Sequence, residues 1–287
     1  MSPKEIKALI YLLEDSDPQV SEHVFSKLIS IGQSVIPALE EEWQKKENEE
    51  IQQKLEDIIR IIQFEELKCE FERWSKLENP DLLTGAFLVS KYFYPTIKFE
   101  DIKKKIYKHK QRIWLDLNYN ESALEQVRTF NQTFFSIQGF GAAQSDSLDF
   151  KEFCINHLLE TKKGNPLSLG ILYQIIANDL DLPIYGVALL KNFVLCFCKS
   201  NIQSTEQQEK EVLFYLNPVN NGSVFSRNQI VEYLDKLNAP HLPKYFNPTS
   251  NTQIVKVLLS TLIEILWHLQ KADSANDLKV LLDNLEE

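Results

Sequence analysis

The sequence predicts a mostly helical α+β fold in which a small antiparallel sheet is flanked by helical segments that resemble repeats. Three observations predict it. Residues 1–76 carry apolar side chains at three- and four-residue spacing and contain no strand-like run. Residues 184–199 and 211–216 are rich in Val, Phe and Leu, as strands are. Helical spacing returns after residue 250, so we expect helices at both ends of the chain and the sheet between them.

The N-terminal segment, residues 1–76, is expected to form helices only. Asp17-Pro18 has the residue types of a helix start, and Gly32 ends the apolar face that follows. The stretch from Leu12 to Val20, together with residues 31–39, resembles a HEAT-type helical repeat. Because such repeats bury their apolar faces against a neighbour, we expect this segment to stack on other helices.

The middle of the chain is predicted to be helical up to residue 160. Asn79-Pro80-Asp81 should begin a helix that Pro95 ends, and Gly139 should supply a left-handed C-terminal cap. The other helices expected here are 99–117, 122–135 and 150–160.

After residue 160 the pattern changes. A helix from Pro166 is followed by one strand-like run over 184–199, a polar hairpin loop over 201–210 and a second strand over 211–216. The turn at 217–222 and a helix at 226–237 come next. A proline-containing linker then leads to helices at 250–270 and 274–286, with Ser274 as the expected N-cap. This last pair resembles a TPR-type hairpin and could equally be an ordinary αα-hairpin.

Composition limits the classes of partner. The 287 residues are 44% hydrophobic and 25% charged, as in ordinary globular proteins. The net charge of −10 repels phosphate backbones and anionic membranes, so we expect neither nucleic acid nor a membrane as partner. The start of the chain lacks a signal-peptide pattern, and no run approaches the ~20 uncharged apolar residues of a membrane span. We therefore expect a cytoplasmic protein.

One short basic cluster stands out against this acidic background. It lies in a stretch with helical spacing, and charge runs of this kind usually solvate a helix face, which is how we interpret it. Its members are Lys103, Lys104, Lys105, Lys108, Lys110 and Arg112.

Residues 80–238 resemble the SirB-like, transglutaminase-related family. The segments that carry the resemblance, in matching order and spacing, are 131–140, 158–169, 171–173, 182–187, 192–193 and 217–222. The resemblance implies a papain/transglutaminase-like core, with a helix packed on a small antiparallel sheet. The expected organisation is thus a HEAT-like segment at 1–76, this domain at 80–238 and a TPR-like hairpin at 249–287.

The resemblance also points to the positions of a catalytic triad. Related enzymes use a Cys at a helix N-terminus, a His on a neighbouring strand and an Asp that orients the imidazole. These positions fall here on Pro166, Asn192 and Asn217. Proline carries no nucleophile, which is common in this family, and asparagine is no general base near pH 7. We therefore expect no catalytic residue and a noncatalytic protein-interaction or scaffolding module, with an unidentified protein or peptide partner.

Two interpretations remain open for the polar residues of the former cleft, Asn165, Ser168, Asn192 and Asn217. They could line a binding pocket for a peptide or a small molecule, which would make the protein a sensor. They could equally serve a helix start and turns. Gly164 and Gly186 should resist larger residues if their φ angles are positive.

An enzyme with a relocated nucleophile is a further alternative, acting as a cysteine-dependent amidase, acyltransferase or peptidase. The cysteines at 69, 154, 196 and 198 lack metal-ligand spacing, and we expect them to be buried thiols. Cys196 lies four residues after Asn192 on the same predicted strand but would need a histidine partner. The sequence predicts neither a metal nor a cofactor.

Overall fold

The computed structural model describes residues 3–15, 17–46, 48–143, 149–190, 192–199 and 211–285. It divides the chain into two compact units, Met1–Glu70 and Phe71–Glu287. Among the described helices, none is both long and apolar enough to cross a membrane.

The N-terminal unit is helical, as the spacing of its apolar residues predicts. Asp17 caps α2 by accepting a hydrogen bond from the Gln19 N–H, and Pro18 occupies the first turn. Its elements are α1 (Pro3–Leu12), α2 (Pro18–Ile31), a 3-10 turn (Gly32–Val35), α3 (Ile36–Trp43) and most of α4 (Glu49–Ser75). Its core is formed by Ile6, Ile10, Leu13, Val24, Leu28, Val35, Leu39, Ile51, Leu55, Ile58 and Ile62. The resemblance to a HEAT repeat stays a prediction.

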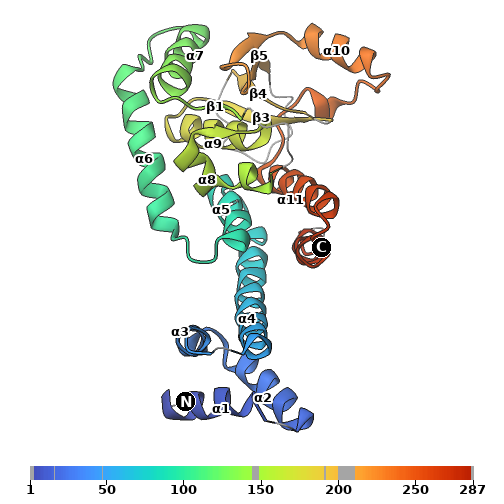
Figure 1. Ribbon diagram of the computed structural model, residues 1–287. Coiled ribbons are helices and arrows are strands. Elements are labelled where there is room, and N and C mark those ends of the chain that lie inside the picture. Colours follow the sequence, from blue (N-terminus) through green and yellow to red (C-terminus); the bar gives the residue numbers. More distant parts are fainter. Residues whose placement is uncertain are drawn as a thin grey trace. The chain divides into compact units, whose positions relative to one another are not determined.

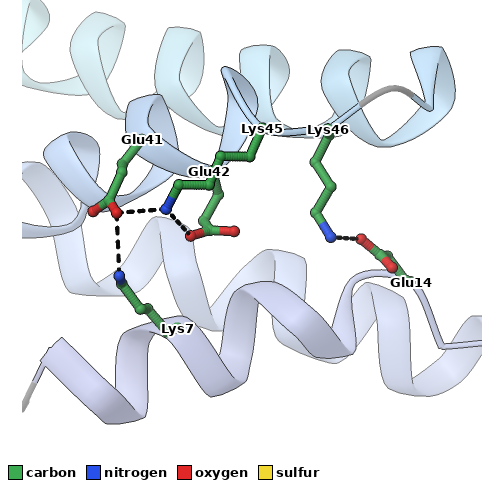
Figure 2. A network of polar contacts seen from close by, with 6 residues as sticks. All are labelled: Lys7, Glu14, Glu41, Glu42, Lys45 and Lys46. Atoms are coloured by element: carbon green, nitrogen blue, oxygen red, sulfur yellow. Dashed lines mark hydrogen bonds and ion pairs between the residues drawn. The ribbon is translucent and has the colours of Figure 1, made fainter.

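Ion pairs join α1 to the end of α3 on the surface of this unit (Figure 2). Lys7 pairs with Glu41, which also pairs with Lys45, and Lys46 pairs with Glu14. The Lys45 contact lowers the pKa of Glu41 through a hydrogen bond. Because these side chains are partly or largely exposed, each pair is expected to add little to stability.

In the described part of the C-terminal unit, five α-helices lie between the end of α4 and the main sheet. They are α5 (Leu82–Phe93), α6 (Phe99–Asp116), α7 (Ala123–Asn131), α8 (Ile155–Thr161) and α9 (Pro166–Asp179). Asp81 caps α5, and Ser122 forms a capping box with Glu125 at the start of α7. Gly139 has a φ of +82° and its N–H bonds the Phe135 carbonyl, so the predicted left-handed cap is confirmed.

Two predicted helices of this unit are each divided in two. Where one helix was expected over 122–135, the α-helix α7 ends at Asn131 and a π-helix, Gln132–Ile137, follows it. The helix expected over 150–160 is a 3-10 turn, Phe150–Phe153, followed by α8. In the second case the Ser90 hydroxyl accepts a hydrogen bond of 2.8 Å from the Ile155 N–H, which lets a new helix begin there.

The main sheet has four antiparallel strands in the order β3 (Ile184–Leu189), β4 (Asn192–Cys198), β5 (Val212–Asn217) and β6 (Ser223–Phe225). The single strand predicted over 184–199 is wrong: it is the β3–β4 hairpin, whose turn includes Leu190 with a φ of +50°. The predicted loop at 201–210 lies outside the described residues. Two further features were not predicted from the sequence: β6, and a short parallel pair of β1 (Gly141–Ala142) with β2 (Lys163–Gly164).

The two faces of the sheet are covered by different elements (Figure 1). On one face, the Phe193 ring packs against Gly170 of α9, and Gly186 lies close to Ile254 of α11. On the other face, α10 (Arg227–Lys236) and a 3-10 turn (Pro243–Tyr245) cover strand residues. The buried residues of this second face are Val187, Leu189, Val194, Cys196, Cys198, Tyr215, Ile230, Leu234, Tyr245 and Phe246.

The chain ends with two packed helices, α11 (Asn251–His268) and α12 (Ala272–Asp283). Ser250 caps α11 by accepting from the Gln253 N–H. The prediction that Ser274 caps α12 is wrong, because the helix begins at Ala272 and Ser274 lies inside its first turn. The TPR-like character of the pair stays a prediction.

Candidate functional site

The start of α9 is the position where the resemblance places a catalytic nucleophile. Asn165 Oδ1 accepts hydrogen bonds from the N–H groups of Leu167 (2.9 Å) and Ser168 (3.0 Å). In return, Ser168 Oγ accepts from the Asn165 N–H at 3.1 Å. The Leu169 N–H bonds the Asn165 carbonyl at 3.0 Å, and Pro166 has no N–H. Every backbone N–H between residues 165 and 169 is therefore either bonded or absent, whereas the side-chain Nδ2 of Asn165 is buried without a hydrogen-bond partner among the described residues.

Close packing at Gly164 also leaves no room for a larger residue beside this helix start. A Cβ on Gly164 would lie 2.5 Å from Ser168 Oγ and 2.9 Å from Leu158 Cδ1. The Gly164 carbonyl also accepts a hydrogen bond of 2.9 Å from the Ala143 N–H. Neither Gly164 nor Gly186 has a positive φ angle. Larger residues are disfavoured at both positions because an added Cβ would clash with neighbouring side chains.

Asn192, the position of the histidine, begins β4 and is exposed. Its Nδ2 donates a hydrogen bond of 2.7 Å to the hydroxyl of Tyr233 on α10. Side chains alternate along a strand, and the next residue, Phe193, packs on Gly170 of α9. Asn192 therefore lies on the α10 face of the sheet, opposite to α9.

Asn217, the position of the acidic residue, ends β5 and organises the turn to β6. Its Oδ1 accepts from the Val219 N–H at 3.2 Å, and its carbonyl accepts from the Gly222 N–H at 2.9 Å. This side chain-to-backbone bond is an Asx turn. Of the four polar residues considered for a cleft, the structure joins Asn165 and Ser168, and the hydrogen bonds given above direct Asn192 and Asn217 elsewhere.

The same region holds a partly buried polar relay that was not predicted from the sequence. The Tyr173 hydroxyl donates to Asn131 Oδ1 at 2.9 Å, and Asn131 Nδ2 donates to the Gly222 carbonyl at 2.8 Å. Burial raises the pKa of Tyr173 well above its ordinary value. The Tyr173 ring packs against the rings of Phe130, Phe134 and Phe135. Phe140 in turn stacks on Phe134. Asn131 and Tyr173 both lie in segments that carry the family resemblance, but nothing in those segments indicates that the two residues meet.

Three of the four thiols are buried, at Cys154, Cys196 and Cys198. Cys196 and Cys198 are buried on the α10 face of β4 with their sulfurs 4.0 Å apart, which confirms that they share one face. Burial raises the pKa of Cys154 to about 12. Cys69 is exposed, so the expectation of four buried thiols is wrong there.

Two histidine rings bond an amide or a carboxylate. His109 Nδ1 bonds Gln138 Oε1 at 2.6 Å, and His241 Nε2 bonds Asp235 Oδ1 at 2.7 Å. Among the hydrogen bonds of the described residues, none joins a cysteine to a histidine ring. The part of the chain that the structure describes also contains no group of three or more metal-ligating side chains.

The fold and this helix–sheet arrangement are those of a transglutaminase-like domain. A family model described as the transglutaminase-like superfamily matches residues 100–260, more than half of the chain, and the protein belongs to that superfamily. A UPF0162 protein from Vibrio cholerae serotype O1 is 25% identical over 190 residues, which cover 64% of this chain and 67% of that protein. No solved structure matches the chain.

Proposed function

We propose that this protein is a noncatalytic member of its superfamily that acts as an interaction or scaffolding module for a protein or peptide partner in the cytoplasm. The observation that carries the proposal is the start of α9. Proline at 166 removes the nucleophile and also the backbone N–H that such a residue could offer to a developing oxyanion. The remaining N–H groups of the first turn are bonded to Asn165.

The other two triad positions support the proposal. Asn192 is bonded to Tyr233 on the far side of the sheet, and Asn217 is bonded to its own turn. Neither amide is a general base near neutral pH. An arrangement of this kind keeps the helix–sheet core and leaves the fold to present surfaces to a partner.

The thiols argue against the alternative of a relocated nucleophile. The nucleophile of such an enzyme is a thiolate, and its pKa is normally lowered by a neighbouring cation or a helix N-terminus. Burial instead raises the pKa of Cys154 to about 12. Cys196 and Cys198 are buried among apolar residues of the α10 face.

The test is the rate of alkylation of each cysteine in the native protein between about pH 5 and pH 9, read by mass spectrometry, a range that brackets the ordinary thiol pKa. Cys69 is expected to react readily, because it is exposed. Cys154, Cys196 and Cys198 are expected to react only on unfolding. Fast reaction of one of these three near pH 6, together with turnover of an acyl or amide substrate that alkylation abolishes, would overturn the proposal.

A further inference from the structure

The strongest unexplained feature outside the former catalytic region is the outer face of α6. This helix buries Ile102, Ile106 and Ile113 against the rest of the C-terminal unit. Figure 1 shows α6 along one edge of that unit, with one long side turned away from α8 and α9. We call the residues of that side the α6 outer face. They are Lys104, Tyr107, Lys108, Trp114 and Leu115.

These five residues form one stripe. Their spacing of three, four and seven residues places them on the same side of a helix. The three apolar members are more than half exposed: Tyr107 at 54%, Trp114 at 57% and Leu115 at 66%. A solvated helix face explains the lysines but gives no reason for exposed tryptophan, tyrosine and leucine between them. Tryptophan and tyrosine are the residues that most often dominate the energy of protein interfaces.

Of the six basic residues of α6, the four outside the α6 outer face already lie within 4.0 Å of a carboxylate, which leaves Lys104 and Lys108 to face a partner; the four are Lys103, Lys105, Lys110 and Arg112. α6 carries six basic and three acidic residues, a net +3 within a chain of net −10. Lys104 faces Asp101 at 3.9 Å with both side chains largely exposed, which is a weak contact. Among the described ion pairs, none involves Lys108.

The length of the stripe limits what can bind to it. Glu100 and Asp101 lie at one end of α6 and Asp116 at the other. The basic and apolar stretch between them, residues 104–115, is about 17 Å long at 1.5 Å per residue. A nucleic acid or an anionic membrane would extend past these carboxylates and be repelled. A short acidic segment of a protein fits between them.

From this charge complementarity we infer that the α6 outer face docks a short, acidic, amphipathic helical segment of a partner protein. Its apolar side chains would pack on Tyr107, Trp114 and Leu115, and its carboxylates would face Lys104 and Lys108. The inference rests on the proposed function, because it gives the noncatalytic module a partner class and a place to bind it.

The experiment uses the full chain and a fluorescein-labelled synthetic peptide of about 16 residues, long enough to cover the stripe as a helix. The peptide carries Glu and Leu at helical spacing, and a matched peptide carries Gln in place of each Glu. Binding is measured by fluorescence anisotropy at low and high salt. A single-stranded oligonucleotide and vesicles containing phosphatidylserine are measured alongside as competing polyanions.

Two variants test the surface, Trp114→Ala and the double substitution Lys104→Glu/Lys108→Glu. Their matched controls are Trp267→Ala and Lys279→Glu, which change an exposed tryptophan and an exposed lysine on α11 and α12. Each test variant should weaken binding by about tenfold or more, as truncation of an interface anchor does. The controls should stay within about twofold, and high salt should weaken the acidic peptide by screening.

Three results would overturn the inference: no saturable binding of the acidic peptide, equal binding by the test variants, or tighter binding of the oligonucleotide or the vesicles. A circular dichroism spectrum of each variant verifies that it is folded. The alkylation and turnover assay addresses the proposed function separately. A protein without thiol catalysis that fails to bind the peptide contradicts only the docking surface, whereas a catalytic protein contradicts the proposed function itself.

Discussion

The hydroxyl of Tyr173 donates a hydrogen bond of 2.9 Å to Oδ1 of Asn131, and this contact joins α9 to the end of α7. Asn131 also contacts a third segment, because its Nδ2 donates a hydrogen bond to the Gly222 carbonyl in the β5–β6 turn. Three segments far apart in the sequence thus meet at one half-buried amide.

Tyr173→Phe should destabilise the protein, because it removes the donor of Asn131 Oδ1 in a partly buried site. We expect a loss of about 1 kcal/mol in the free energy of unfolding, the usual net contribution of one hydrogen bond. Urea denaturation measures it. Tyr119→Phe is the matched control, because that hydroxyl bonds the Leu180 carbonyl from a half-exposed side chain. Equal losses in the two variants would contradict a special role for the relay.

Gly222→Ala should cost more than an ordinary glycine replacement. Gly222 has a φ of +67°, and an added Cβ would lie 2.1 Å from Asn131 Oδ1. Gly139→Ala is the control, with a φ of +82° but nothing nearer than 3.9 Å. The left-handed backbone costs each alanine about 1–2 kcal/mol. Displacement of Asn131 should add about 1–3 kcal/mol at position 222 alone. Urea denaturation of the two variants tests this. Equal losses in the free energy of unfolding would show that the Asn131 side chain can move aside without cost.

The helices were predictable because their signals are local. Asp81, Ser122 and Ser250 each accept a hydrogen bond at the helix start where their residue types predict a cap. The core architecture was predictable only through the family resemblance, since the contact between α9 and the sheet joins distant segments. The hairpin at Leu190 was missed because its turn lacks the Gly or Asn that usually marks such turns.

The candidate site was harder to predict for a geometric reason. Neighbouring strand residues point to opposite faces, so the sequence alone does not say whether Asn192 or Phe193 faces α9. The structure turns Phe193 toward α9 and Asn192 toward Tyr233. The Asn131–Tyr173 contact was not predictable either, because the two residues are 42 positions apart and no local pattern links them.

Gly186→Ala should be destabilising through packing. An added Cβ would lie 2.2 Å from Phe193 Cζ and 3.0 Å from Ile254 Cδ1, while the backbone itself is unstrained. Overpacking of this kind costs about 1–3 kcal/mol. Gly141→Ala is the control, since its nearest contact is the flexible end of Lys163 at 3.4 Å. In a Phe193→Leu background the Gly186→Ala loss should shrink by about 1 kcal/mol or more, which a double-mutant cycle in urea measures. Additive losses would exclude the Phe193 ring as the cause.

His109 should make stability depend on pH. Burial lowers the pKa of His109 from its ordinary value of 6.5, the nearby Lys162 lowers it further, and the Gln138 hydrogen bond opposes them by raising it. Gln138 Oε1 accepts only, so the neutral ring carries its proton on Nδ1. Below about pH 6.5 the unfolded chain binds this proton more readily than the folded one, so stability falls as pH falls.

The measurement is the melting temperature of the native protein and of His109→Gln between about pH 8 and pH 5, which spans the titration of an ordinary histidine. The native protein should lose stability more steeply below about pH 6.5 than the variant, because only the native chain has this proton uptake on unfolding. The comparison cancels the contribution of the carboxylates, which both proteins share. Parallel pH profiles would mean that the His109 ring accepts a proton as easily in the folded protein as in the unfolded chain. A steeper loss in the variant would mean that the folded state stabilises the charged ring, opposite to the direction that burial predicts.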